Sequence, residues 1–222
     1  MRYMLAAFLL LFTGLPVYGQ AFSCTASASS QPTVRARGRA ELVGDVILDC
    51  NGLRPSGGLT ADSITVTLNV PLTSRILNVP LNASEALMLL ESPPADQQVG
   101  QALGAPPSNL ANVLQGRQVA PNAVQWNAVP LAGQGPVGSV QRSVRITNLR
   151  ANVESLPTGG VVIATVTIGS QSTIALNNGV QNVGTVAPPL AFSVRTPDDL
   201  STFSQQISGC TGKGIAVTGD TP

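Results

Sequence analysis

The carboxylates of this chain come closest to a catalytic or metal-binding pattern. Asp45 and Asp49 lie four residues apart in a segment of strand character, and Asp198 and Asp199 are adjacent near the C-terminus. Two carboxylates that face one cleft can hydrolyse glycosides, and several oxygen ligands can bind Ca²⁺. The spacing matches no calcium loop, however, so we expect a solvated strand face and a helix N-terminus. The sequence therefore predicts neither a metal site nor a cofactor.

Arginines form a second pattern, which suggests an anion-binding face. Arg35, Arg37 and Arg39 alternate, and a second group contains Arg142, Arg145 and Arg150. If both segments were strands, their guanidinium groups would line an outer face suited to anions or polysaccharide. We favour the alternative, a polar edge strand whose charge prevents pairing with other strands.

Missing side chains exclude several chemistries. The 222 residues contain no histidine, and Lys213 is the only lysine. Ser–His and Cys–His nucleophiles and His-ligated metals are therefore impossible. The segment GCTGKG at 209–214 departs from a phosphate loop, because Ile207 stands where its first glycine belongs and Gly214 replaces the final Ser or Thr. We predict a protein without catalytic activity.

The overall charge balance indicates no polyanionic partner. The chain carries 12 basic and 11 acidic residues, and charged residues make up only 10% of it. A nearly neutral protein has no strong field to attract nucleic acid or an anionic membrane. We therefore expect neither as a partner.

The N-terminus has the order of charged, apolar and small residues that is typical of a secretory signal peptide. Its parts are Arg2, the run MLAAFLLLF at 4–12, the breakers Gly14 and Pro16, and the small residues Gly19 and Ala21. The apolar run is shorter than the roughly 20 residues of a membrane span. We predict that residues 1–19 are cleaved and that the protein is secreted or held at the cell surface, with no membrane span after cleavage. An uncleaved anchor and a lipoprotein modified at Cys24 are the alternatives.

Export would place the cysteines Cys24, Cys50 and Cys210 in an oxidising compartment, where two of them pair. We favour a disulfide between Cys24 and Cys50, whose loop contributes roughly 3 kcal/mol in the chain-entropy model. Cys210 would then be unpaired or form an intermolecular link. Pairing of Cys50 with Cys210, which closes a larger loop, stays open.

Alternation of apolar and polar residues with a period of two predicts strands over much of the chain. The segments are 41–50, 63–70, 123–129, 140–149 and 161–168, with a weaker one at 84–90 and a last one around Leu190, Phe192 and Val194. The expected inward residues include Ile64, Val66, Leu68, Val70, Val124, Trp126 and Ala128. Asn177-Asn178-Gly179 predicts a tight hairpin between 174–176 and 180–186.

Many short strands separated by turns predict an all-β fold, specifically an antiparallel Ig-like β-sandwich over residues 20–195. Thr196-Pro197 followed by two acids is a helix start. We therefore expect a short helix and a flexible tail over 196–222.

Two stretches carry a resemblance to known proteins, VRARGRAELVGDVILDCNG at 34–52 and SVRITNLRAN at 143–152, with the segment around Cys24 before them and FSV…FSQQISGC within 192–210 after them. Together they resemble a group of exported bacterial Ig-like β-sandwich proteins of unassigned function. In that group such a domain often opens a longer surface protein. The resemblance supplies no catalytic residues.

The sequence thus favours a structural or adhesive module outside the cell, without catalytic activity. Its expected partners are other surface or matrix proteins, bound through edge strands. The alternatives are a secreted hydrolase that uses carboxylates on polysaccharide, and a module that binds a small ligand or Ca²⁺.

Overall fold

The computed structural model describes residues 22–54, 58–101, 110–132, 138–170 and 174–188. Contacts divide the chain into Met1–Pro189 and Leu190–Pro222, and every described residue belongs to the first unit. The predicted signal peptide, the strand around Phe192, the helix start at Thr196 and the tail lie outside the described residues.

Strands dominate the described residues, so the prediction of an all-β protein is confirmed. The strands are β1 Ser23–Ala28, β2 Thr33–Arg35, β3 Glu41–Leu42, β4 Val46–Arg54, β5 Leu59–Leu68, β6 Ile76–Asn78, β7 Ala83–Leu90, β8 Val113–Ala120, β9 Ala123–Ala132, β10 Gly138–Thr147, β11 Arg150–Ala151, β12 Val161–Gly169, β13 Ala175–Asn177 and β14 Val180–Ala187. A 3₁₀ turn, η2, covers Ala95–Gln97. Within these ranges no helix has the length and apolar character needed to cross a membrane.

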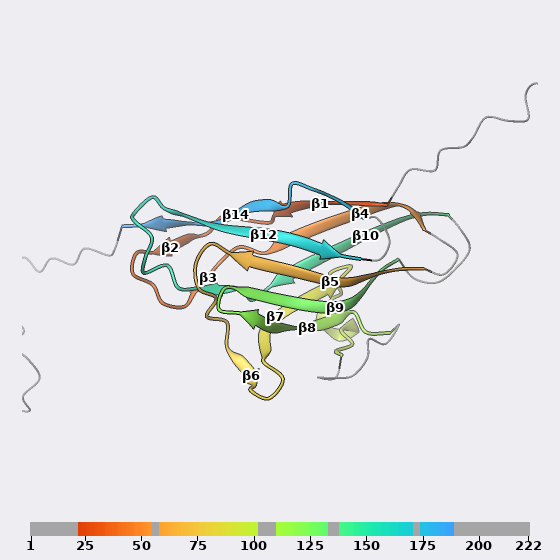
Figure 1. Cartoon of the computed structure of the whole chain (residues 1–222), viewed down its shortest axis with the longest axis horizontal. Coiled ribbons are helices and arrows are strands. Elements are labelled where there is room, and N and C mark those ends of the chain that lie inside the picture. The colour runs from red at the N-terminus through yellow and green to blue at the C-terminus, as the bar shows by residue number, and fades with distance from the viewer. Residues whose placement is uncertain (1–21, 55–57, 102–109, 133–137, 171–173, 189–222) are drawn as a thin grey trace, which may run out of the picture. The chain divides into compact units, whose positions relative to one another are not determined.

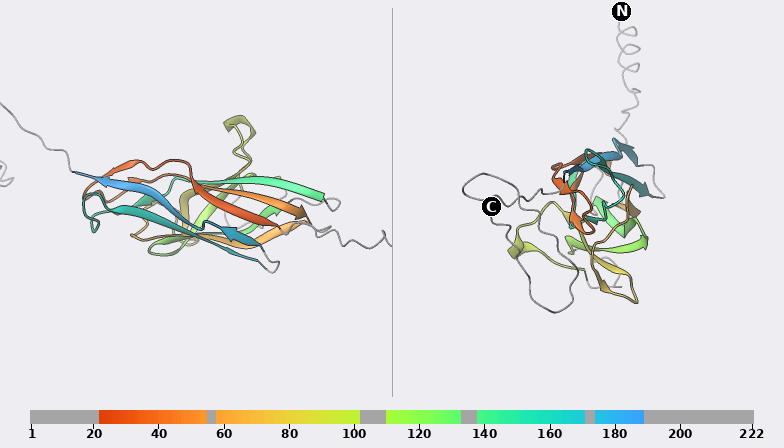
Figure 2. Two further views of the ribbon diagram at one scale, coloured as in Figure 1. Left: turned by 90° about the horizontal axis from the view of Figure 1, so that it is seen from above. Right: turned by 90° about the vertical axis from the view of Figure 1, so that its left-hand side faces the viewer.

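Twelve strands form one curled sheet, a half-barrel (Figure 1). The order is β13-β1-β4-β10-β7-β8-β9-β5-β12-β14-β2, with β6 paired to β7, and β3 and β11 make a separate two-stranded sheet. Seen end-on, the strands surround a common interior (Figure 2, right). The pairs β1–β13 and β14–β2 are parallel, so the sheet is mixed rather than antiparallel throughout.

Two chain segments join the two ends of this sheet, and we call the place where they meet the seam. At one end of the sheet, β13 is the last strand and β1 is its neighbour. At the other end, β2 is the last strand and β14 is its neighbour. The segments β1–β2 and β13–β14 therefore each place one strand at either end. Across the seam, Gln181 Nε2 donates to Ala26 O at 3.0 Å and Gly44 N donates to Val183 O at 2.7 Å. The same segments thus hold both ends of the curled sheet.

The predicted hairpin at Asn177-Asn178-Gly179 is wrong. β13 pairs with β1, and β14 pairs with β12 and β2, so the two strands do not pair with each other. Asn178 has a φ of 53°, a left-handed conformation that asparagine tolerates. The turn therefore forms as its residues suggest, but it passes the chain from one end of the sheet to the other.

The core is built from the inward rows that the alternation predicts. Ile64, Val66 and Leu68 of β5 are buried, and Val70 just after the strand is buried too. The prediction fails at Ala128, whose φ of 51° shifts the phase of β9. Val129 is buried in its place. The facing strand β5 changes phase at the same point, because Ala61 opposite Val129 and Ile64 opposite Trp126 are both buried.

Trp126 is the largest fully buried side chain, and a glycine makes room for it. Its indole Nε1 donates to Leu114 O at 3.1 Å. A Cβ at Gly116 of β8 would lie 2.6 Å from Cγ2 of Val124 and 2.9 Å from Cζ2 of Trp126. Gly116 is therefore required by the close approach of β9 side chains.

The disulfide between Cys24 and Cys50 is confirmed. The two residues face each other in the antiparallel pair β1–β4, and both are fully buried. The bond fixes β1, one of the strands at the seam, to the neighbouring strand of the sheet. The expected state of Cys210 lies outside the described residues.

Loss of this disulfide should destabilise the protein substantially. A loop with a sequence separation of 26 residues contributes about 3 kcal/mol by restricting the unfolded chain. We expect the double variant Cys24→Ser/Cys50→Ser to lose about that much in urea unfolding followed by the fluorescence of Trp126. Oxidised wild type is the reference, and an unchanged unfolding midpoint would show that the bond does not support the seam.

Candidate functional site

The two aspartates singled out from the sequence do not form an isolated carboxylate pair. Asp45 lies just before β4, where Arg145 Nε donates to its Oδ2 at 2.7 Å. Asp49 lies on β4 and is exposed. Across the described parts of the chain, no cluster of three His, Cys, Asp or Glu is placed to hold a metal ion. Asp198 and Asp199 fall outside those parts.

The arginines that predicted an anion-binding face are mostly paired with carboxylates. The ion pairs are Arg35–Glu41 at 3.0 Å, Arg39–Glu154 at 3.1 Å, Arg142–Glu91 at 3.5 Å, Arg150–Glu85 at 3.0 Å, and Arg145–Asp45. Arg35 ends β2, and Arg37 follows in a turn with a φ of 62°. The alternating arginines therefore do not lie along one strand, and the carboxylates paired with Arg35 and Arg39 occupy the groups that an anion would need there.

Arg39 and Glu154 illustrate how little such a surface pair contributes. The hydrogen bond from Arg39 and the negative charge of Glu154 raise the pKa of the guanidinium above its ordinary value. Both side chains are exposed, and water screens such pairs strongly. This pair is a feature of the solvated surface.

A half-open pocket of about 560 Å³ lies beside the end of β7. Its walls come from Leu90, Glu91, Pro93, Pro94, Gln97, Leu110, Ala111, Asn112, Pro130 and Arg142. The side-chain amide of Asn112 is already engaged, because Val99 N donates to its Oδ1 at 2.8 Å and its Nδ2 donates to Gln97 O at 2.9 Å. The charged groups of the pocket are thus Glu91 and Arg142.

The charged pair of the pocket is held on a strained backbone. Glu91 and Ser92 both have positive φ, 61° and 43°, a conformation that costs of order 1–3 kcal/mol for each residue. Nε of Arg142 is buried and has no hydrogen-bond acceptor among the described residues, and Oε1 of Glu91 lies 3.5 Å away. The pocket therefore combines an apolar wall with a guanidinium that is incompletely satisfied.

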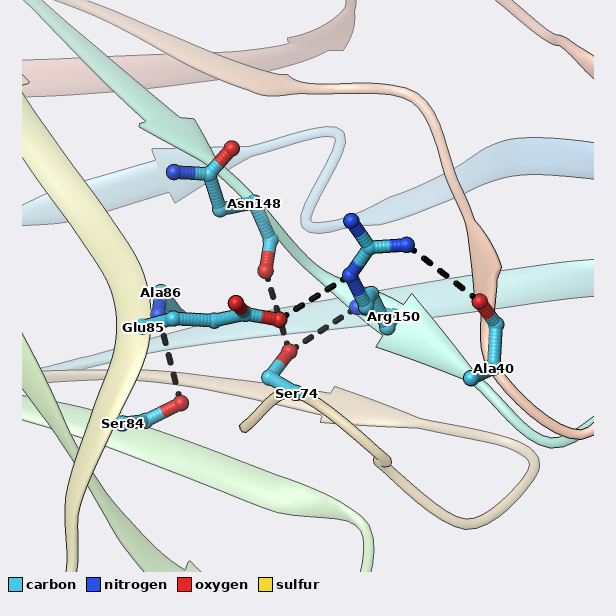
Figure 3. A network of polar contacts seen from close by, with 7 residues as sticks. All are labelled: Ala40, Ser74, Ser84, Glu85, Ala86, Asn148 and Arg150. Carbon is cyan, nitrogen blue, oxygen red and sulfur yellow. Dashed lines mark hydrogen bonds and ion pairs between the residues drawn. The ribbon is translucent and has the colours of Figure 1, made fainter. Parts of the chain in front are cut away.

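A polar network anchors the start of β6 and β7 to the β10–β11 turn (Figure 3). Ser74 Oγ donates to Asn148 O at 3.0 Å and accepts from Arg150 N at 2.9 Å. Arg150 Nε donates to Glu85 Oε1 at 3.0 Å. Arg150, which the sequence suggested for anion binding, instead fixes the base of the β6–β7 hairpin.

The far end of this hairpin exposes apolar side chains. It stands out from the rest of the sheet below β7 and β8 (Figure 1). Leu77 is 53% exposed, Val79 74% and Leu81 37%. Val119 of β8 is 48% exposed and lies close by, since Gln118 N donates to Asn82 O at 2.8 Å. We call Leu77, Val79, Leu81 and Val119 the apolar tip.

The apolar tip is the feature that reasoning from the sequence missed. Residues 76–81 read ILNVPL, a run of apolar residues broken by Pro80 and flanked by turn residues. Such a run is also typical of a buried strand, so the pattern alone does not distinguish a core segment from an exposed one. The signal that was available is Pro80 itself, which is confined to edges and turns in sheets.

No protein-family model matches the chain, and no curated protein sequence matches it significantly.

Two neighbouring residues at the hairpin base should respond in opposite ways to loss of a hydroxyl. Ser74→Ala leaves Asn148 O and Arg150 N without partners in a buried site, so we expect a loss of about 1–3 kcal/mol. Thr73 Oγ1 is buried and has no hydrogen-bond partner among the described residues. Thr73→Val should therefore leave stability unchanged or raise it, as measured by urea unfolding. Equal losses in both variants would contradict the assignment of the network.

Proposed function

We propose that the chain is a secreted or cell-surface β-domain without catalytic activity, which adheres to a surface through the apolar tip of its β6–β7 hairpin. The observation that carries the proposal is the concentration of exposed apolar groups. Of the nine large apolar side chains exposed in the described parts of the chain, three lie within residues 77–81. Contiguous exposed apolar groups on a soluble domain typically mark an interaction site.

The anchoring of the hairpin supports a role in contact. Ser74, Glu85 and Arg150 form a buried or half-buried network at its base, whereas Leu77 and Val79 at its end face solvent. A projecting element with a fixed base presents its apolar groups at little entropic cost on binding. In addition, β6 pairs only with β7 among the described strands, so its outer edge is open to strand addition.

The arrangement of carboxylates favours a binding role over hydrolysis. Glycoside hydrolysis needs two carboxylates in one cleft, roughly 5–10 Å apart. The pocket beside β7 contains one, Glu91, and that group pairs with Arg142. The hydrolase alternative therefore lacks its second acid in this pocket.

The closer assignment to exported Ig-like β-sandwich proteins is part of this proposal. It rests on the resemblance of residues 34–52 and 143–152, and on the number of short strands around one core. A disulfide between buried cysteines and a signal-like N-terminus agree with export.

The adhesive role predicts that the tip is needed for retention on cells. Processed protein is labelled and incubated with intact producing cells, and the bound fraction is measured after washing. The double variant Leu77→Ser/Val79→Ser should lower retention about tenfold. Burial of a leucine and a valine side chain against the partner contributes more than about 1.4 kcal/mol to binding, which corresponds to a factor of ten in affinity. Mass spectrometry of the protein recovered from the medium and from washed cells tests export and cleavage at the same time.

Val180→Ser is the matched control, since Val180 is 62% exposed on β14, away from the hairpin. It should bind as wild type does. If wild type is not retained, or if the tip variant is retained as well as the control, the adhesive role is wrong.

A second candidate function is binding of a small carboxylate in the pocket beside β7. The observation that favours it is the buried Nε of Arg142, which has no acceptor within the described residues. A guanidinium beside apolar walls suits a carboxylate that bears a short hydrocarbon group.

Hexanoate is a suitable probe for this candidate. Saturating hexanoate should raise the Tm by about 3 °C in wild type, and Arg142→Gln should abolish the shift. Arg37→Gln provides the control, because Arg37 is exposed and no described acid pairs with it. Equal shifts in wild type and Arg142→Gln would refute a site at this guanidinium.

A further inference from the structure

We propose that the partner of the apolar tip is an anionic lipid surface, into which the end of the β6–β7 hairpin inserts shallowly. This inference rests on the adhesive function proposed above and names the chemistry of its partner. It depends on the local distribution of charge around the tip, which the nearly neutral total conceals.

Acidic residues are absent from the sequence on both sides of the tip. None occurs from Ser63 to Ser84, and none occurs from residue 97 to residue 153. The basic residues in these two stretches are Arg75, Arg117, Arg142, Arg145 and Arg150. Apart from Glu85 of β7, which pairs with Arg150, the strands that form and flank the hairpin therefore carry no acidic residue.

Two of these arginines differ from the others in having no carboxylate partner. Arg142, Arg145 and Arg150 form ion pairs, whereas Arg75 and Arg117 are exposed and no described acid pairs with them. Each unpaired cation near an anionic membrane contributes roughly a fivefold gain in binding.

The pairing of strands places both cations beside the tip. Arg75 immediately precedes β6. Arg117 pairs with Ala83, which in turn pairs with Asn78 between two residues of the tip. Because neighbouring strands lie about 4.8 Å apart, the backbone of Arg117 is about 10 Å from that of Asn78. An apolar projection with a cation on each side fits a membrane, which has a hydrocarbon interior and anionic lipid headgroups at its surface.

A second copy of the chain is a poorer partner for the same surface. In a two-fold dimer the same patch would meet itself, so both copies would bring Arg75 and Arg117 to one contact. Like charges brought together in this way oppose association. The bound partner must instead supply negative charge around an apolar interior.

The test is sedimentation with lipid vesicles. Processed protein is mixed with vesicles of phosphatidylcholine alone, or with about one third phosphatidylglycerol added. We expect wild type to bind the anionic vesicles, and Leu77→Ser/Val79→Ser to bind them about tenfold less. Arg75→Gln/Arg117→Gln should also lose binding to the anionic vesicles, by roughly tenfold or more, and raised salt should weaken wild type in the same way.

Two controls separate the tip from other surfaces. Val180→Ser removes an exposed apolar group elsewhere, and Arg37→Gln removes an exposed cation that no described acid pairs with. Both should bind vesicles as wild type does. All variants are compared at the same N-terminus, fixed by intact mass, because an uncleaved apolar N-terminus would add the same background to each. Urea unfolding confirms that each variant is folded.

The outcomes distinguish the lipid partner from the adhesive function on which this inference rests. If wild type does not bind anionic vesicles, or if the tip and arginine variants bind like their controls, the lipid partner is wrong. If the tip variant nonetheless loses retention on cells, and protease treatment of those cells abolishes wild-type retention, adhesion stands with a protein partner. If both assays fail for wild type, the adhesive function fails as well.

Discussion

Closure of the curled sheet at its seam is the constraint on which the rest of the structure depends. A sheet with two free ends exposes unpaired N–H and C=O groups along each of them. Here the segments β1–β2 and β13–β14 each supply a strand at both ends, and the hydrogen bond from Gln181 to Ala26 crosses between them. The disulfide from Cys24 to Cys50 then fixes β1 to the sheet. The strands at the two ends of the sheet, β13 and β2, have only three residues each. Such short edge strands offer few unpaired groups for pairing with a strand of another chain.

The β6–β7 hairpin projects from this closed sheet (Figure 1). Its base is held by Ser74, Glu85 and Arg150, and its end exposes Leu77 and Val79. Elsewhere on the described surface, arginines are mostly paired with carboxylates, which neutralise the charge that attracts an anionic ligand. The chemistry that remains at the tip is apolar contact flanked by unpaired cations. A binding role at this hairpin is therefore the interpretation that the contacts favour.

The sequence predicted strand content and inward faces well, because both follow from a local period of two. Ile64, Val66 and Leu68 are buried as expected, and the pairing of Cys24 with Cys50 follows from their positions on adjacent strands. Two kinds of information were not local. The partners of β13 and β14 are set by the curl of the whole sheet, so the turn at Asn178 does not close a hairpin. The candidate site was missed for a related reason: ILNVPL is apolar whether it lies in the core or projects from it. Likewise, no spacing rule links Arg150 to Glu85, which lies 65 residues earlier.

The pairing at the seam also has a consequence for the order in which the protein folds. Ser23 pairs with Ala175, and Thr33 pairs with Thr185, so the first two described strands pair with the last two. Contacts between residues this far apart in the sequence raise the contact order of the fold. Folding is slower as a result, because the chain loses the entropy of closing a long loop before the stabilising contacts form. A ribosome makes the N-terminal strands well before their partners exist. The growing chain must therefore keep β1 and β2 unpaired at one side until synthesis passes residue 187, and a chaperone or a translocation channel that shields these strands would shorten the time in which they can aggregate.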